Sequence, residues 1–254
     1  TVDDFLTLLF AHAKDLAEKH LNQEVDRAVI AVPDGAHDPK RIQIKRACET
    51  AGLAVRQLLN QTTAAALGYR FDKGARKSLS VIDVGASHTS MSIIEGGADR
   101  LDTVEIKHTD IGTNDFKNKL ILFAARRLDR FWETTNVLKE IEFEATRALV
   151  ELSSSESAVI SIGGFGPRRL VEVTRDELKE CTTSEMQKIE AVLRDTRFNL
   201  YNLSALLLIG GGANIPAVRK MVDCIYRKAP FISDSVDPIY AVAMGAAVKG
   251  GILD

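Results

Sequence analysis

Apolar residues recur at two different spacings along the chain, and the alternation of these spacings predicts a mixed α/β protein. Residues 2–21 place an apolar side chain every three to four positions, which predicts an amphipathic helix. The next apolar run, residues 26–33, has the length of a strand and is stopped by Pro33. Because few polar residues interrupt it, we expect a strand buried on both faces of a sheet.

The rest of the chain continues in the same manner. Residues 38–52 predict a helix capped by Asp38, residues 53–59 a short strand, and residues 62–71 a helix of small residues. A polar, glycine-containing stretch at 72–77 then predicts a boundary between two lobes. The later elements are three strands joined by short turns (78–85, 89–96, 100–110), helices within 114–152 with Trp132 as a packing anchor, a hairpin (157–174), a helix (174–196), a strand–glycine turn–helix (203–226) and a small-residue helix (237–253).

Composition excludes several classes of protein. The chain has 254 residues, 45% hydrophobic and 27% charged, which suits one large domain or two lobes. A net charge of −2 argues against a protein that coats nucleic acid or an anionic membrane, and no apolar run approaches the roughly 20 residues of a membrane span. Three widely spaced cysteines predict free thiols rather than a zinc site. The first residue, Thr1, stands within a helical pattern, so we expect a fragment of a longer protein.

Two glycine loops are candidates for binding phosphate. The first follows the strand 78–85 and contains Asp83, Gly85, Ala86, Ser87 and His88. The second comprises Gly210, Gly211 and Gly212 and follows an apolar strand. Glycine lets backbone N–H groups approach a ligand, although a glycine turn equally serves to connect a strand to a helix.

The order of the segments is more specific than either loop. The stretches AVIAVP, QTTAAALGY, VIDVG, LSSS, LLLIGGGANIPAVRKMV and DPIYAVAMGAAVKGGIL occur in the order and spacing found in the seventy-kilodalton heat-shock chaperones. The chain resembles the nucleotide-binding domain of that Hsp70 family, which belongs to the actin-like ATPases. The resemblance implies an α/β, ribonuclease-H-like fold with two lobes around a cleft for ATP or ADP with Mg²⁺.

The resemblance also implies a division of the chain. Residues 1–72 would form part of the first lobe with the helix between the lobes, and residues 73–254 the second lobe. Within the second lobe, 73–111 and 182–254 would form one part and 112–181 the other. The first lobe is expected to be incomplete, because the family's opening phosphate-binding hairpin does not occur in this sequence.

Several residues depart from the family pattern on the side of the phosphates. Gln61 stands where the family has a Glu that organises metal and water, and an amide cannot take a proton as a carboxylate does. Ser90 replaces the family's second Asp, Ala86 and Ser87 replace two glycines, and His88 replaces a Thr. Asp83 is retained and is the candidate for holding a magnesium-bound water, although it equally suits a strand end without a ligand.

The nucleoside side departs as well. Thr146, Leu149 and Val150 replace a Glu, a Lys and an Arg that surround the purine and ribose in the family, while Ser153 is retained and Asn214 replaces the Arg that stacks on the base. Since a hydrogen bond to a charged group contributes about 1.5–3 kcal/mol, three losses weaken binding by roughly 4 kcal/mol.

These departures favour a pseudo-ATPase that acts as a structural or regulatory module in a larger assembly, with protein partners such as co-chaperones and neither nucleic acid nor membrane. The alternative is the C-terminal part of a working Hsp70-type ATPase domain, whose upstream hairpin restores function. A sugar or acetate kinase relative is a third, weaker reading. The ending MGAAVKGGIL favours an intracellular location in the mitochondrial matrix over the cytosol.

Overall fold

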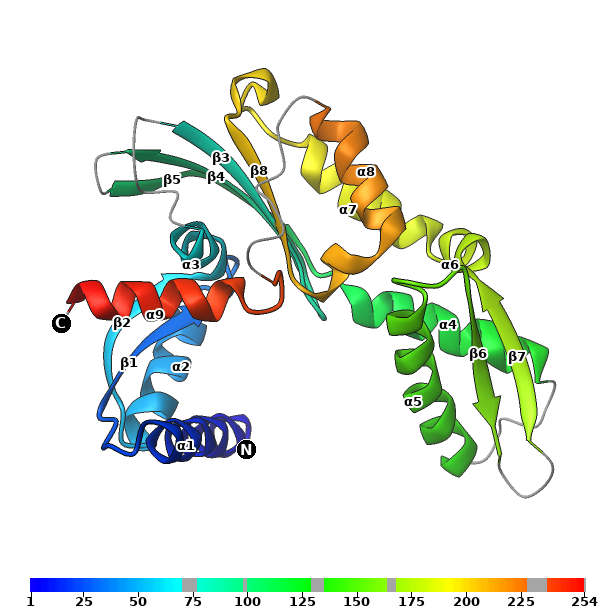
Figure 1. Cartoon of the computed structure of the whole chain (residues 1–254), viewed down its shortest axis with the longest axis horizontal. Coiled ribbons are helices and arrows are strands. Elements are labelled where there is room, and N and C mark those ends of the chain that lie inside the picture. Colours follow the sequence, from blue (N-terminus) through cyan, green and yellow to red (C-terminus); the bar gives the residue numbers. More distant parts are fainter. Residues whose placement is uncertain (70–76, 98–99, 129–134, 164–167, 228–236, 254) are drawn as a thin grey trace.

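The computed structural model describes residues 1–69, 77–97, 100–128, 135–163, 168–227 and 237–253. Its elements lie in three groups along the long axis of the molecule (Figure 1). The first group holds the N-terminus, the middle group contains a four-stranded sheet, and the third contains a two-stranded hairpin. The C-terminal helix returns to the first group, so both ends of the chain lie there (Figure 1).

We call the first group the N-terminal unit, residues 2–60. It consists of α1 (Val2–Leu21), β1 (Arg27–Val32), α2 (Asp38–Thr50) and β2 (Ala54–Asn60), and its two strands are parallel. α1 begins with a capping box between Thr1 and Asp4 and has no buried residue. In α2, His37 is the N-cap residue and Asp38 is the first helical residue, one position from the predicted cap.

The expectation that the first strand is buried on both faces is wrong. In β1 only Val32 is buried, whereas Arg27 is exposed and the residues between them are partly exposed. The cause is the width of the sheet. Among the described residues β1 pairs with β2 alone, and a sheet of two strands presents its edges and much of its surface to solvent.

The middle group, which we call the central sheet, has the strand order β5-β4-β3-β8. Its strands are β3 (Lys77–Val84), β4 (Thr89–Gly97), β5 (Arg100–Thr109) and β8 (Ala205–Ile209). The first three form the predicted antiparallel meander, and β8 lies parallel to β3. Helices cover both faces, so every residue of β8 is buried, which explains its uninterrupted apolar sequence.

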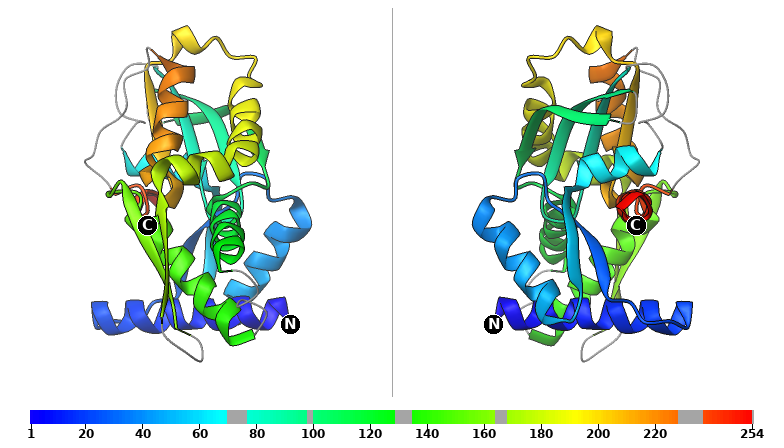
Figure 2. Two further views of the ribbon diagram at one scale, coloured as in Figure 1. Left: turned by 90° about the vertical axis from the view of Figure 1, so that its right-hand side faces the viewer. Right: turned by 90° about the vertical axis from the view of Figure 1, so that its left-hand side faces the viewer.

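Alternate side chains of the central sheet enter two different cores. Ile82, Val84 and Leu206 pack with α7 (Thr183–Arg194) and α8 (Pro216–Tyr226). Leu79 and Val81 face the opposite way, toward α3 (Gln61–Gly68) and α9 (Ala241–Leu253). The two views of Figure 2 show these helices on opposite sides of the sheet.

α3 and α9 pack backbone against backbone. A Cβ atom at Gly68 would lie 2.7 Å from the Ala241 carbonyl oxygen, and one at Gly245 would overlap the carbonyl of Ala64. Ala65 and Ala66 are fully buried beside this contact. The small residues predicted for both helices are therefore required by the close approach of two main chains.

The third group contains α4 (Thr113–Arg127), α5 (Thr135–Glu151), β6 (Ser157–Ile162), β7 (Arg169–Thr174) and α6 (Arg175–Cys181). β6 and β7 form the predicted antiparallel hairpin. The prediction of a single helix over 174–196 is wrong, because the helix is interrupted between α6 and α7. At the break, the Leu178 carbonyl accepts hydrogen bonds from both the Thr182 N–H at 3.0 Å and the Thr182 hydroxyl at 2.8 Å, and a threonine hydroxyl bonded in this way often bends a helix.

Two predictions lie outside the described residues: Trp132 as a packing anchor, and the lobe boundary within residues 72–77, of which only Lys77 is described. The division into two lobes stays a prediction. In the described part of the chain, the helices are all too short or too polar to cross a membrane. The three cysteines are free thiols, with Cys48 buried and Cys224 exposed.

Candidate functional site

The turn between β3 and β4 places Asp83 and residues 85–88 at one end of the central sheet. The Gly85 N–H donates to the His88 carbonyl at 3.0 Å, which closes the turn. The start of α4 holds the turn from the other side, since Thr113 N–H donates to the Gly85 carbonyl at 2.9 Å and Asn114 N–H to the Ala86 carbonyl at 2.8 Å. The first predicted loop is thus a fixed turn between a sheet and a helix.

The second glycine loop packs directly on the end of β3. Gly210 has φ +82°, and a Cβ atom there would lie 2.5 Å from the Asp83 Oδ1 atom and from the Val84 carbonyl oxygen. A Cβ atom at Gly212 would overlap the side chain of Val84, whereas one at Gly211 would meet no atom within 4 Å. The structure therefore brings the two predicted loops together, and it explains Gly210 and Gly212 by close packing.

Sequence reasoning missed the acid at the centre of this site. Asp34, in the connection between β1 and α2, is 8% exposed, and its carboxylate accepts hydrogen bonds from four donors. The donors are the Thr62 hydroxyl, the Thr62 N–H at 3.4 Å, the Ser90 hydroxyl at 3.2 Å and the Ser92 hydroxyl at 3.5 Å. The available signal was an acid two residues after the end of β1, since ligands in α/β proteins bind at the carboxyl ends of strands.

Two buried carboxylates therefore lie near each other. Burial raises the pKa of Asp83 to about 6, and the charge of Asp34 contributes to that rise. Burial also raises the pKa of Asp34, although its hydrogen bonds from Thr62 and Ser90 oppose the change. Unlike Asp34, Asp83 receives no hydrogen bond from any described residue. An unpaired carboxylate that is 5% exposed is costly unless a proton or a cation accompanies it.

Two further polar atoms are buried without a hydrogen-bond partner in the described structure, Gln61 Oε1 and His88 Nε2. Burial lowers the pKa of His88 and so favours its neutral form, although Asp34 acts in the opposite direction. Gln61 is the first residue of α3, next to Thr62. The predicted residues Gln61, Asp83, His88 and Ser90 thus lie on the elements that surround Asp34.

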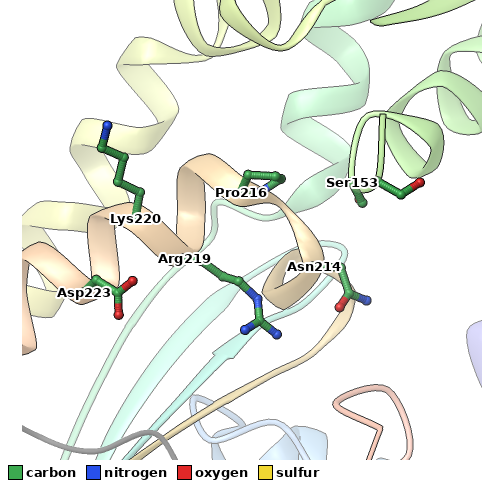
Figure 3. A pocket seen from close by; sticks show the side chains of 7 residues that line it. Ser153, Asn214, Pro216, Arg219, Lys220 and Asp223 are labelled. Carbon is green, nitrogen blue, oxygen red and sulfur yellow. The ribbon is translucent and has the colours of Figure 1, made fainter. Parts of the chain in front are cut away.

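On the nucleoside side, the structure brings Ser153 and Asn214 to one open cavity of about 580 Å³ (Figure 3). α8 supplies most of the other wall, and the lining residues are Ser153, Ser154, Asn214, Pro216, Arg219, Lys220 and Asp223. Arg219 is the residue that sequence reasoning missed here. Its Nε atom donates to the Ala213 carbonyl at 2.7 Å, which fixes the guanidinium beside the glycine loop.

The other three predicted positions on the nucleoside side, Thr146, Leu149 and Val150, lie on α5. The Thr146 hydroxyl donates to the Glu142 carbonyl at 2.9 Å in the preceding turn, and Leu149 packs against two hydrophobic cores. Val150 is 69% exposed. None of the three side chains lines the cavity.

The site offers only a few oxygen atoms that could bind the magnesium ion of a nucleotide. Asp83 and Gln61 offer a carboxylate and an amide oxygen that no described residue uses, and Mg²⁺ prefers such ligands. The described residues contain no group of three or more His, Cys, Asp or Glu that could hold a metal ion. Phosphate oxygens and water would have to supply the other ligands.

Comparison with known proteins identifies the family. The model of the family described as "Hsp70 protein" matches residues 3–254. Over 255 aligned residues the chain is 31% identical to "Stromal 70 kDa heat shock-related protein, chloroplastic" of Spinacia oleracea. That alignment covers 94% of this chain and 42% of the relative, so the chain spans less than half of the relative's length. The fold is that of the actin-like ATPases, and the chain belongs to the Hsp70 family.

Proposed function

We propose that this chain is an Hsp70-type nucleotide-binding domain that binds adenine nucleotide weakly, hydrolyses it poorly and acts as a structural or regulatory module. The observation that supports this most strongly is that the site has few carboxylates available to bind a metal ion or to accept a proton. Gln61 and Ser90 carry no charge, and the carboxylate of Asp34 already accepts four hydrogen bonds. A carboxylate has about four acceptor positions, so these donors compete with a metal ion or water for Asp34.

Asp83 is then the one carboxylate among the described residues of this site that accepts no hydrogen bond and is available to bind a metal ion. Phosphoryl transfer depends on placing a metal ion and an attacking water together, and one acid supports only part of that arrangement. Gln61 can orient a water molecule but cannot accept its proton. We therefore expect hydrolysis to be slow even where a nucleotide is bound.

The nucleoside side supports weak binding rather than none. Arg219 presents a planar cation that is held by the Ala213 carbonyl, and guanidinium groups stack on aromatic rings. Ser153 and Asn214 add a hydroxyl and an amide to the same cavity. Because the cavity is open and Asn214 is exposed, we expect these contacts to contribute little affinity each.

The test is calorimetric titration of the full chain with Mg-ATP and with adenosine, together with single-turnover hydrolysis. The spinach relative's nucleotide-binding domain is the positive control. We expect Mg-ATP to bind about a thousandfold more weakly than to the relative, from the roughly 4 kcal/mol lost on the nucleoside side. We expect hydrolysis to be at least about a hundredfold slower. Sub-micromolar binding with turnover at the relative's rate would support the alternative, a working ATPase domain.

A pair of variants tests the role of Arg219. Arg219→Ala should weaken adenosine binding by about tenfold, because it removes the stacking cation. Lys220→Ala removes the same charge from the same cavity wall without removing a planar group, so its effect should stay within about twofold. Equal losses in the two variants would show that net charge, and not stacking, governs binding.

Partners and compartment are proposed on separate grounds. We propose a protein partner for α1, because Val2, Phe5 and Leu8 are 66%, 66% and 69% exposed on one helix. Titration of a co-chaperone against the wild type and against Phe5→Glu/Leu8→Glu tests this, and equal affinities would contradict it.

For the compartment we propose the mitochondrial matrix, with the cytosol as the alternative. A fluorescent fusion of the full-length protein tests it, and a plastid marker is included because the spinach relative is chloroplastic by name.

A further inference from the structure

The buried polar cluster around Asp34 joins two groups of elements that the sheet topology leaves separate. Asp34 belongs to the N-terminal unit, and Thr62 is the second residue of α3. Ser90 and Ser92 lie on β4 of the central sheet, two residues apart, so both point to the same face of the strand. The N-terminal unit and the central sheet share no strand pairing among the described residues. Hydrogen bonds between side chains therefore connect them at this point.

The residues of this cluster are buried and hydrogen-bond to one another. Thr62, Ser90 and Ser92 are 0% exposed, and Asp34 is 8% exposed. Thr62 Oγ1 also lies 2.8 Å from Ser92 Oγ, so these two hydroxyls bond to each other only when one of them does not donate to Asp34. Each oxygen of Asp34 has two donors: Thr62 and Ser92 hydroxyls for Oδ1, and the Ser90 hydroxyl and Thr62 N–H for Oδ2. At 8% exposure, Asp34 is largely shielded from the water that would compete with its donors.

A second contact connects the same two groups close by. Gly35, next to Asp34, lies against the ring of His108 on β5, and a Cβ atom at Gly35 would be 3.0 Å from two ring atoms. The connection between β1 and α2 thus contacts both β4 and β5 through adjacent residues. These polar contacts add to the apolar packing through α3 and α9, where Leu59 of β2 and Leu101 of β5 belong to one hydrophobic cluster.

We propose that Asp34 is a latch that keeps the N-terminal unit closed on the central sheet in the absence of nucleotide. The hydroxyl groups of Ser90, Ser92 and Thr62 donate to a carboxylate that the chain itself supplies. Closure then depends on the sequence of this loop and not on a bound phosphate. The inference does not rest on the proposed function, because a latch of this kind closes the molecule whether or not nucleotide binds elsewhere.

The test measures the distance between the two groups in nucleotide-free protein. Spin labels are placed at Lys19→Cys on α1 and at the native Cys224 on α8, both exposed, in a Cys181→Ser background, since Cys48 is buried. Pulsed electron resonance then gives the distance distribution of the full chain. We expect a single narrow distribution for the latched protein, and a broader one with a longer mean distance for Asp34→Ala.

Two further variants make the result specific. Ser90→Ala/Ser92→Ala removes only the donors on β4, so it should broaden the distribution as well, and it decides the matter if Asp34→Ala fails to fold. Asp110→Asn alters an exposed acid at the end of β5 and should leave the distribution unchanged. The proposal is overturned if the Ser90→Ala/Ser92→Ala distribution matches that of the latched protein, or if the latched protein itself shows a broad distribution.

Discussion

The most direct consequence of the buried acid pair is that replacing Asp83 by Asn should stabilise the protein at neutral and alkaline pH. The Asp83 carboxylate is 5% exposed, lies near Asp34 and receives no hydrogen bond from any described residue. Its charged form is therefore disfavoured in the folded protein. Asn keeps the size and shape of the side chain while removing the charge.

The magnitude follows from the pKa of Asp83, which burial raises from 3.8 to about 6 in the folded protein. A group whose folded pKa is raised contributes most stability when it is protonated, below the unfolded pKa. That contribution is lost as the pH rises from about 4 to about 6. At about 1.4 kcal/mol for each pKa unit, the loss is about 3 kcal/mol, and it persists above pH 6. Asp83→Asn should recover up to this amount at pH 8 and little or nothing below pH 4.

The assay is urea unfolding of wild type and variant at several pH values between 4 and 8, with a chelator present so that no divalent cation binds Asp83. The wild type should lose stability relative to Asp83→Asn across pH 4–6, and the difference should then stay constant. Asp110→Asn, which alters an exposed acid nearby, should change stability by less than about 0.5 kcal/mol at every pH. A variant that is less stable than the wild type at pH 8 would refute the reasoning, because it would mean that the carboxylate is favourably paired.

Three smaller predictions concern glycines and thiols. Gly210→Ala should cost at least about 2 kcal/mol in thermal unfolding, because φ is +82° and the new Cβ meets β3, whereas Gly211→Ala should stay within about 0.5 kcal/mol. Gly245→Ala should cost more than about 3 kcal/mol, since its Cβ would overlap the backbone of α3. Cys48 is fully buried with its pKa raised to about 11, so at pH 8 it should react with Ellman's reagent at least about a hundredfold more slowly than exposed Cys224, and equally fast in guanidinium.

Most of the fold could be predicted because the apolar pattern reports local burial. β8 is covered on both faces and reads as five consecutive apolar residues, and the glycine turn after it predicted the adjoining helix. β1 has a similar apolar sequence but is only partly buried, because burial depends on how many strands lie beside it. The break at Thr182 was missed for a related reason, since a threonine inside a helical pattern shows no sign of the carbonyl its hydroxyl will bond.

The candidate site was predicted less completely. Asp83, Gly85, Ser90 and the glycine loop were found because they stand at positions of a known pattern, and the structure brings them together. Asp34 was missed because that pattern assigns it no role. Its importance arises only when α3 and β4 bring three hydroxyl groups to it from residues 28 to 58 positions away. Arg219 was missed because its place beside Asn214 depends on how the helix after the glycine loop turns.

The contact between α3 and α9 has a consequence for how the molecule can deform. Helices that interlock through ridges of large side chains are held at a preferred crossing angle. At Gly68 and Gly245 main chain meets main chain, so no interdigitating ridges resist a small rotation of one helix over the other. The orientation of whatever is attached to these helices must then be determined farther from the crossing point, where leverage is greater. The hydroxyl groups that bond to Asp34 can in this way set the orientation of the whole N-terminal unit.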